Sequence, residues 1–121
     1  MSYEEKSEIA KRAYTFGVDV IKFVSKLPVN PANAILIRQV IRSATSIGAN
    51  IEEALGGHTK SDFAYGMNVA KKEARETRYW LRMLSDINNL KGSLKYEKLP
   101  QEVEELINIL TKIVKTSTNK K

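Results

Sequence analysis

Apolar residues recur along this 121-residue chain at alternating spacings of three and four positions, which places them on one face of an α-helix. Four such runs predict helices over about residues 3–27, 31–55, 60–89 and 99–116. The residues expected to face the core are Ile9, Ala13, Phe16, Val20, Phe23 and Leu27, then Ile37, Val40, Ala44, Ile47, Ile51 and Ala54, then Phe63, Met67, Ala70, Ala74, Thr77, Leu81 and Leu84, and finally Val103, Leu106, Leu110 and Ile113.

Signals at the helix starts support these runs. Ser2 followed three positions later by Glu5 has the pattern of a capping box before the first helix. Asn30 can cap the second helix, with Pro31 at its first position, and Thr59 can cap the third.

Helix-breaking residues predict the connections. Pro28 ends the first helix, and the pair at 56–57 (Gly-Gly) ends the second. We expect residues 90–96 to form a loop and the fourth helix to open around Pro100. Because the connections are mostly short and no hairpin signal occurs, the pattern predicts an all-α fold. That fold is an antiparallel up-down-up-down four-helix bundle with one domain over residues 1–121.

Composition limits the class of protein. Hydrophobic residues make up 42% and charged residues 28%, which is ordinary for a globular protein. No apolar stretch approaches the roughly 20 residues that cross a bilayer, so we expect no membrane partner. The first six residues lack the apolar core of a signal peptide, which predicts a cytoplasmic protein. The absence of cysteine excludes disulfides and thiolate metal sites.

The net charge is +6, and the excess lies in the second half of the chain. Residues 60–91 carry seven positive and four negative side chains, and residues 92–121 carry six and four. Clustered Lys and Arg neutralise phosphates, so this balance is compatible with a nucleic-acid partner. Solvated lysines explain the same charge equally well.

The sequence contains no motif that is typical of an enzyme. His58 is the only histidine and follows the Gly-Gly turn, where a solvated side chain is the usual case. The Glu-x-x-His pairs of a di-iron bundle are absent, as are a phosphate-binding loop and a Ser/His or Cys/His pair. We therefore expect no catalytic residue, no metal and no cofactor.

A polar stripe runs along the second predicted helix, offset from its core face. Its members recur at spacings of three and four: Arg42, Ser46, Asn50 and Glu53. A solvated polar surface would explain them. The other interpretation is a subunit interface, in which hydrogen bonds determine orientation and the small neighbours permit close packing.

The third predicted helix carries a row of cations: Lys71, Lys72, Arg75, Arg78 and Arg82. One interpretation is contact with a phosphate backbone. The other is a self-neutralised surface, with pairs such as Lys72 and Glu76. The adjacent Tyr79 and Trp80 could stack on bases, although packing in the core or at an interface explains aromatic residues more simply.

These strings resemble the family of 23S ribosomal RNA intervening-sequence proteins across nearly the whole chain. The matching residues are Arg42-Ser43, the string 46–54 (Ser-Ile-Gly-Ala-Asn-Ile-Glu-Glu-Ala), Asp62-Phe63, Met67, Ala70, 72–74 (Lys-Glu-Ala), Glu76-Thr77, 79–81 (Tyr-Trp-Leu) and Leu84. A more distant resemblance is to the accessory protein of diversity-generating retroelements, a pentameric bundle with a basic face that binds nucleic acid and a reverse transcriptase.

The resemblance implies a four-helix bundle and a pentameric ring, and it favours the interface interpretation for Arg42, Ser46, Asn50, Glu53 and Trp80. Two hypotheses on function follow. The first is a non-enzymatic, oligomeric protein that binds RNA or DNA through the cations of the third helix. The alternative is a scaffold that binds a protein partner and has no nucleic-acid role.

Overall fold

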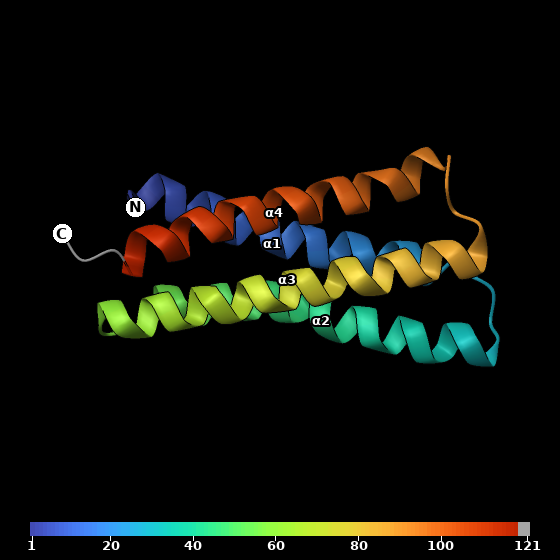
Figure 1. Cartoon of the computed structure of the whole chain (residues 1–121), viewed down its shortest axis with the longest axis horizontal. Helices are drawn as coiled ribbons and strands as arrows, with labels where there is room; N and C mark the ends of the chain where they lie inside the picture. Colours follow the sequence, from blue (N-terminus) through green and yellow to red (C-terminus); the bar gives the residue numbers. More distant parts are fainter. Residues whose placement is uncertain (119–121) are drawn as a thin grey trace.

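The structure, a computed structural model, describes residues 1–118 and contains four long helices (Figure 1). They are α1 (Tyr3–Val24), α2 (Pro31–Leu55), α3 (Lys60–Asn88) and α4 (Leu94–Thr118), and no strand occurs within the described residues. Each helix packs against two others, in the cycle α1–α2–α3–α4–α1. Successive helices run antiparallel, so the structure confirms the predicted four-helix bundle.

The predicted start signals act as expected. The Ser2 side chain accepts the Glu5 N–H while the Glu5 carboxylate accepts the Ser2 N–H, which completes a capping box. The side chain of Asn30 caps α2, and that of Thr59 accepts the N–H of Asp62 at 2.9 Å. Each cap satisfies a backbone donor that has no partner inside its helix.

The core follows the three-four pattern closely. Of the predicted core residues, all are buried except Phe23, Leu27, Ile37 and Phe63, which are half-buried because they lie near helix ends. The fourth helix buries more than the pattern indicated, since Tyr96, Leu99 and Ile107 also enter the core.

Small residues let α2 approach both of its neighbours. A Cβ added at Gly66 of α3 would lie only 2.7 Å from Ala54 Cβ of α2, so only glycine fits there. A Cβ added at Gly48 of α2 would lie 3.6 Å from Ala13 of α1, which is an ordinary contact distance. A side chain larger than that of alanine would come too close to α1. The backbones of α1, α2 and α3 are therefore packed closely.

The predicted start of the fourth helix is wrong by about five residues. α4 begins at Leu94, so much of the expected loop at 90–96 is helical and Pro100 lies inside the helix. Ser93 provides the start, because its backbone oxygen accepts the Glu97 N–H and its hydroxyl lies 3.3 Å from the Tyr96 N.

Burial explains why the helix extends across Pro100. The proline removes one intrahelical hydrogen bond, but Tyr96 and Leu99 are both only 5% exposed. The Tyr96 hydroxyl also donates to the backbone oxygen of Leu81 at 2.9 Å. Burial raises the pKa of Tyr96. The apolar area removed from water compensates for the lost hydrogen bond.

The other helix ends differ by a few residues. α1 ends at Val24 rather than near 27, because residues 26 and 27 form tighter i→i−3 bonds. α3 ends at Asn88, and Asn89 follows in the left-handed conformation (φ 54°). α4 continues to Thr118 rather than ending near 116.

A buried amide pair joins the α1–α2 turn to the end of α3. Asn33 is fully buried, and its Nδ2 donates to Pro28 O at 2.8 Å and to Asn88 Oδ1 at 3.0 Å. Asn88 Nδ2 donates in return to Asn33 Oδ1 at 2.9 Å and to Leu84 O at 3.0 Å. Both polar atoms of each side-chain amide therefore take part in hydrogen bonds.

Replacing either asparagine should destabilise the bundle. We expect Asn33→Ala or Asn88→Ala to lower the free energy of unfolding by about 1–3 kcal/mol, because each leaves buried polar atoms unpaired. The double variant should lose less than the sum of the two, since both changes remove the same hydrogen bonds. Urea unfolding at one protein concentration measures this, with exposed Asn68→Ala as the control. Strictly additive losses would show that the pair is not coupled.

Candidate functional site

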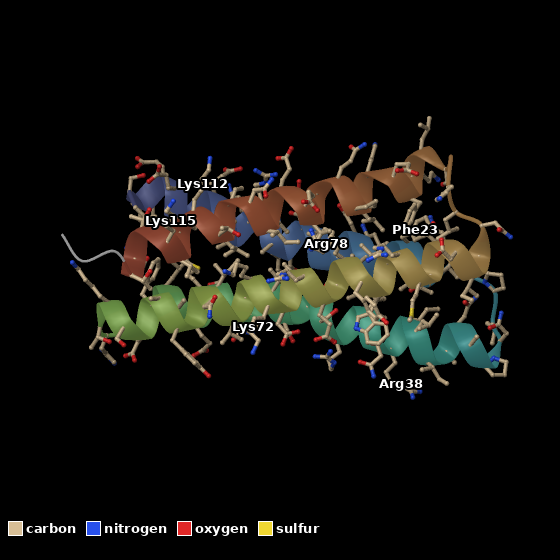
Figure 2. All side chains as sticks on the ribbon, viewed as in Figure 1. Phe23, Arg38, Lys72, Arg78, Lys112 and Lys115 are labelled. Atoms are coloured by element: carbon tan, nitrogen blue, oxygen red, sulfur yellow. The ribbon has the colours of Figure 1, made fainter. Side chains whose placement is uncertain are left out.

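The predicted cations of α3 separate into free and paired members. Lys72, Arg75 and Arg82 are exposed, and Lys71 and Arg78 are half-buried. Arg78 Nη1 lies 2.9 Å from Glu104 Oε1 of α4, so its charge is already balanced. Figure 2 shows Arg78 between the ribbons of α3 and α4, with Lys72 at the other edge of α3 in this view.

Helix α4 adds two cations that the sequence analysis did not assign to a site. Lys112 and Lys115 are exposed near the C-terminal end of α4 (Figure 2). Because α3 and α4 are antiparallel and Arg78 meets Glu104, this end of α4 runs beside the N-terminal half of α3. The sequence signal for these two lysines was the positive charge excess of residues 92–121. That excess did not indicate which helix would pack beside α4.

We call the unpaired cations of α3 and of this end of α4 together the cationic edge. Within residues 1–118 no ion pair involves any of its members: Lys71, Lys72, Arg75, Arg82, Lys112 and Lys115. An unpaired exposed cation keeps its charge available for an anionic partner. The edge therefore differs from the predicted row by losing Arg78 and gaining two lysines.

Two acidic residues of α3, Glu73 and Glu76, pair with α2. Arg42 Nη1 of α2 lies 3.4 Å from Glu73 Oε1, and Arg42 Nη2 pairs with Glu76 Oε2. The sequence interpretation that paired Lys72 with Glu76 is therefore wrong, because Glu76 bonds across to α2. Within residues 1–118 these two carboxylates pair with Arg42 and with none of the α3 cations Lys71, Lys72, Arg75 and Arg82.

The remaining members of the polar stripe bond mainly within α2. Ser46 Oγ donates to Arg42 O at 2.8 Å, and Asn50 Nδ2 donates to Ser46 O at 2.8 Å. Glu53 is exposed and makes no ion pair within residues 1–118. One turn from the stripe, the buried Thr77 Oγ1 and Ser43 Oγ lie 2.8 Å apart and join α3 to α2.

Trp80 is half-buried beside this stripe rather than in the core. Its indole N–H donates to Glu76 Oε2 at 2.9 Å, so Arg42, Glu76 and Trp80 form one connected network across α2 and α3. The ring of Tyr79 meets Trp80 edge-on, with centroids 5.1 Å apart. The network holds a large aromatic ring in one orientation at the surface.

Exposed apolar side chains surround Trp80 along the antiparallel α2/α3 pair. Met83 and Ile87 follow it at helical spacing, and Ile87 is 57% exposed. Ile35 of α2 is 61% exposed, and the contact between Asn33 and Asn88 places it at the same end of the pair. We call Ile35, Trp80, Met83 and Ile87 the apolar patch. Exposed apolar side chains that gather on one surface mark interaction sites.

The described residues show neither a metal-binding cluster nor a membrane-spanning helix. Within residues 1–118, no three or more His, Cys, Asp or Glu side chains gather as a metal ion would require. His58 is exposed in the connection between α2 and α3. None of the helices over this range has the length and hydropathy needed to span a bilayer.

These features define a four-helix bundle whose helix α3 pairs with α4 through Arg78 and with α2 through Glu73 and Glu76. The chain belongs to the 23S rRNA-intervening sequence protein family, whose model matches residues 5–112. The resemblance to this family that was inferred from the sequence is thereby confirmed.

A solved structure with the same fold comes from Bacteroides thetaiotaomicron. It is described as a protein with unknown function from the S23 ribosomal protein family, and it is 31% identical to this chain. The match covers 91% of this chain and 97% of that one, with a TM-score of 0.82. No curated protein matches this chain significantly.

Removing the Glu76 carboxylate should release the Trp80 ring. Trp80 is the only tryptophan, so fluorescence reports on it alone. We expect Glu76→Ala to shift the emission to longer wavelength and to lower its anisotropy, because the indole loses its acceptor. Glu76→Gln should keep the wild-type spectrum, since an amide oxygen can still accept the N–H. The free energy of unfolding should change by less than about 1 kcal/mol in both variants, because Arg42, Glu76 and Trp80 are partly exposed. Identical spectra for both variants would contradict the network.

Proposed function

We propose that the protein is a non-enzymatic, oligomeric bundle that binds RNA or DNA without base specificity through the cationic edge. The observation that supports this proposal most is the set of six exposed or half-exposed cations on α3 and α4 without an ion-pair partner within residues 1–118. Clustered cations of this kind bind phosphates and release counterions. The edge contains no shaped arrangement of donors that would distinguish one base from another.

The dimensions of the edge suit a phosphate backbone. Residues 71 to 82 of α3 extend over about 16 Å at 1.5 Å per residue. One nucleic-acid strand presents about five phosphates over that length, at about 3.4 Å each. One protomer with so few contacts should bind weakly, in the range of about 10⁻⁴–10⁻⁶ M. A symmetric assembly that repeats the edge would raise the affinity without new contacts.

The apolar patch supports the oligomeric part of the proposal. Exposed Ile35, Met83 and Ile87 surround an ordered Trp80, and aromatic anchors inside apolar patches are typical of subunit contacts. Arg42, Ser46, Asn50 and Glu53 adjoin this patch on α2 and would form its polar rim. The pentameric stoichiometry is inferred only from the family resemblance.

The same patch favours the second candidate function. A surface with an ordered indole and exposed aliphatic side chains could equally receive a different protein, and the cationic edge would then only keep the protein in solution. Salt-dependent binding of nucleic acid separates the two candidates, because docking on an apolar patch depends weakly on salt.

Charge reversal tests the cationic edge. We expect the double variant Lys72→Glu/Arg75→Glu to lose at least about tenfold in affinity for a fluorescein-labelled single-stranded RNA at low salt, because two phosphate contacts become repulsive. The control Lys26→Glu/Lys91→Glu has the same net charge change at exposed positions outside the edge and should bind nearly as the wild type does. Fluorescence anisotropy across a salt series measures both.

A milder pair of variants tests the role of Glu104. Arg75→Gln should weaken RNA binding more than Arg78→Gln, because Glu104 already neutralises Arg78. If the wild type shows no binding at low salt, or if the double reversal binds equally well, the cationic edge is not a nucleic-acid surface. The scaffold interpretation would then lead.

Light scattering tests the assembly. We expect the wild type to exceed the monomer mass at tens of micromolar and Met83→Glu/Ile87→Glu to be monomeric, since two charges would be buried in the contact. Leu94→Glu, at an exposed apolar residue outside the patch, should assemble as the wild type does. A monomeric wild type would reject assembly outright, whereas a dimer or tetramer would reject only the pentamer.

A further inference from the structure

One end of the bundle is hollowed. At this end α1 and α3 begin and α2 and α4 end (Figure 1). The hollow has a volume of ≈ 1140 Å³ and is lined by residues from all four helices. We call it the end pocket. A space of this size can hold a small organic molecule.

The walls of the end pocket are largely apolar. Leu55 and Phe63 are half-buried on the α2–α3 side, and Ile113 of α4 lies opposite with 9% exposure. The other lining residues at the α2–α3 connection are small, including Ala54, Gly57, Ser61 and Ala64. Small side chains leave the space that large core residues fill elsewhere in the bundle. Phe63 was expected in the core, and its exposed part faces this space.

The lining is also positively charged. Lys6, Lys60 and Lys112 come from three different helices, and none takes part in an ion pair within residues 1–118. Glu5 is the one carboxylate among the lining residues. It accepts the Ser2 N–H at 2.8 Å, and this backbone hydrogen bond lowers the pKa of Glu5. The Glu5 charge is therefore engaged in the α1 cap, and the lysines exceed it by two.

We propose that the end pocket binds a small amphipathic anion, with its apolar body against Leu55, Phe63 and Ile113 and its anionic head beside the lysines. A neutral apolar molecule would leave the ammonium groups without a counter-charge, and a cation would be repelled by them. A carboxylate or a phosphate bonded to an aliphatic or aromatic body satisfies both parts of the lining. The end pocket shares Lys112 with the cationic edge, but Lys6 and Lys60 belong to the end pocket alone, so the two proposals can be tested separately.

Matched amphiphiles test the chemistry of the ligand. Decanoate and decyltrimethylammonium share a ten-carbon chain and carry opposite charges. Titrated below their micelle concentrations into the full chain, decanoate should shift the amide NMR signals of residues around Leu55, Phe63 and Ile113. Decyltrimethylammonium should bind at least about tenfold more weakly. Decyl phosphate forms a third arm, and tighter binding than decanoate would assign the natural head group to a phosphate.

Two sets of variants test the location. Lys6→Gln/Lys60→Gln should weaken decanoate binding by about fivefold or more, while Lys26→Gln/Lys91→Gln, with the same loss of charge, should stay within about twofold of wild type. Lys6 and Lys60 lie outside the cationic edge, so Lys6→Gln/Lys60→Gln should retain RNA binding. The two proposals can therefore fail independently. Ala64→Phe should fill the space and abolish decanoate binding while leaving the helical circular dichroism unchanged.

The opposite results would overturn the proposal. Equal binding of both charged amphiphiles would remove the anionic specificity. Signal shifts centred on the apolar patch, or unchanged affinity in both Lys6→Gln/Lys60→Gln and Ala64→Phe, would place the binding elsewhere.

Discussion

The rotation of α3 against α2 determines the character of every surface of this bundle. Three contacts along the pair hold it: the amides of Asn33 and Asn88, the hydroxyls of Ser43 and Thr77, and the approach of Gly66 to Ala54. They occur at the two ends and the middle of the antiparallel pair. A helix held at three levels cannot turn about its axis without leaving buried polar atoms unpaired or causing a clash, so its flanks point in fixed directions.

That rotation determines which neighbours the charged side chains of α3 meet. The carboxylates of Glu73 and Glu76 meet Arg42 of α2, while Arg78 meets Glu104 of α4. The order of residues along α3 sets the angle between its acids and its bases, and the rotation of α3 determines which neighbouring helix each group meets. The Trp80 network follows from the same rotation, since Glu76 serves both Arg42 and the indole.

Packing density differs between the middle and the end of the bundle. In the middle, residues such as Phe16, Ile47, Leu81 and Leu106 fill the space between the four helices. At the end where the chain begins, small residues bring α2 and α3 together and leave space toward α1 and α4. The same small side chains that permit close packing of one helix pair therefore leave a hollow beside it.

The amino-acid sequence by itself determined the number of helices, most of their core residues and the caps of α1, α2 and α3. These features are local, because helical period and capping depend on residues within a few positions of one another. The start of α4 could not be predicted from local signals. Pro100 is a strong break signal, but Tyr96 and Leu99 gain burial only against helices that are distant in sequence. Which cations remain unpaired was likewise decided in three dimensions, since Glu104 reaches Arg78 across 26 positions. The end pocket joins residues near both ends of the chain, and only the antiparallel packing of all four helices brings them together.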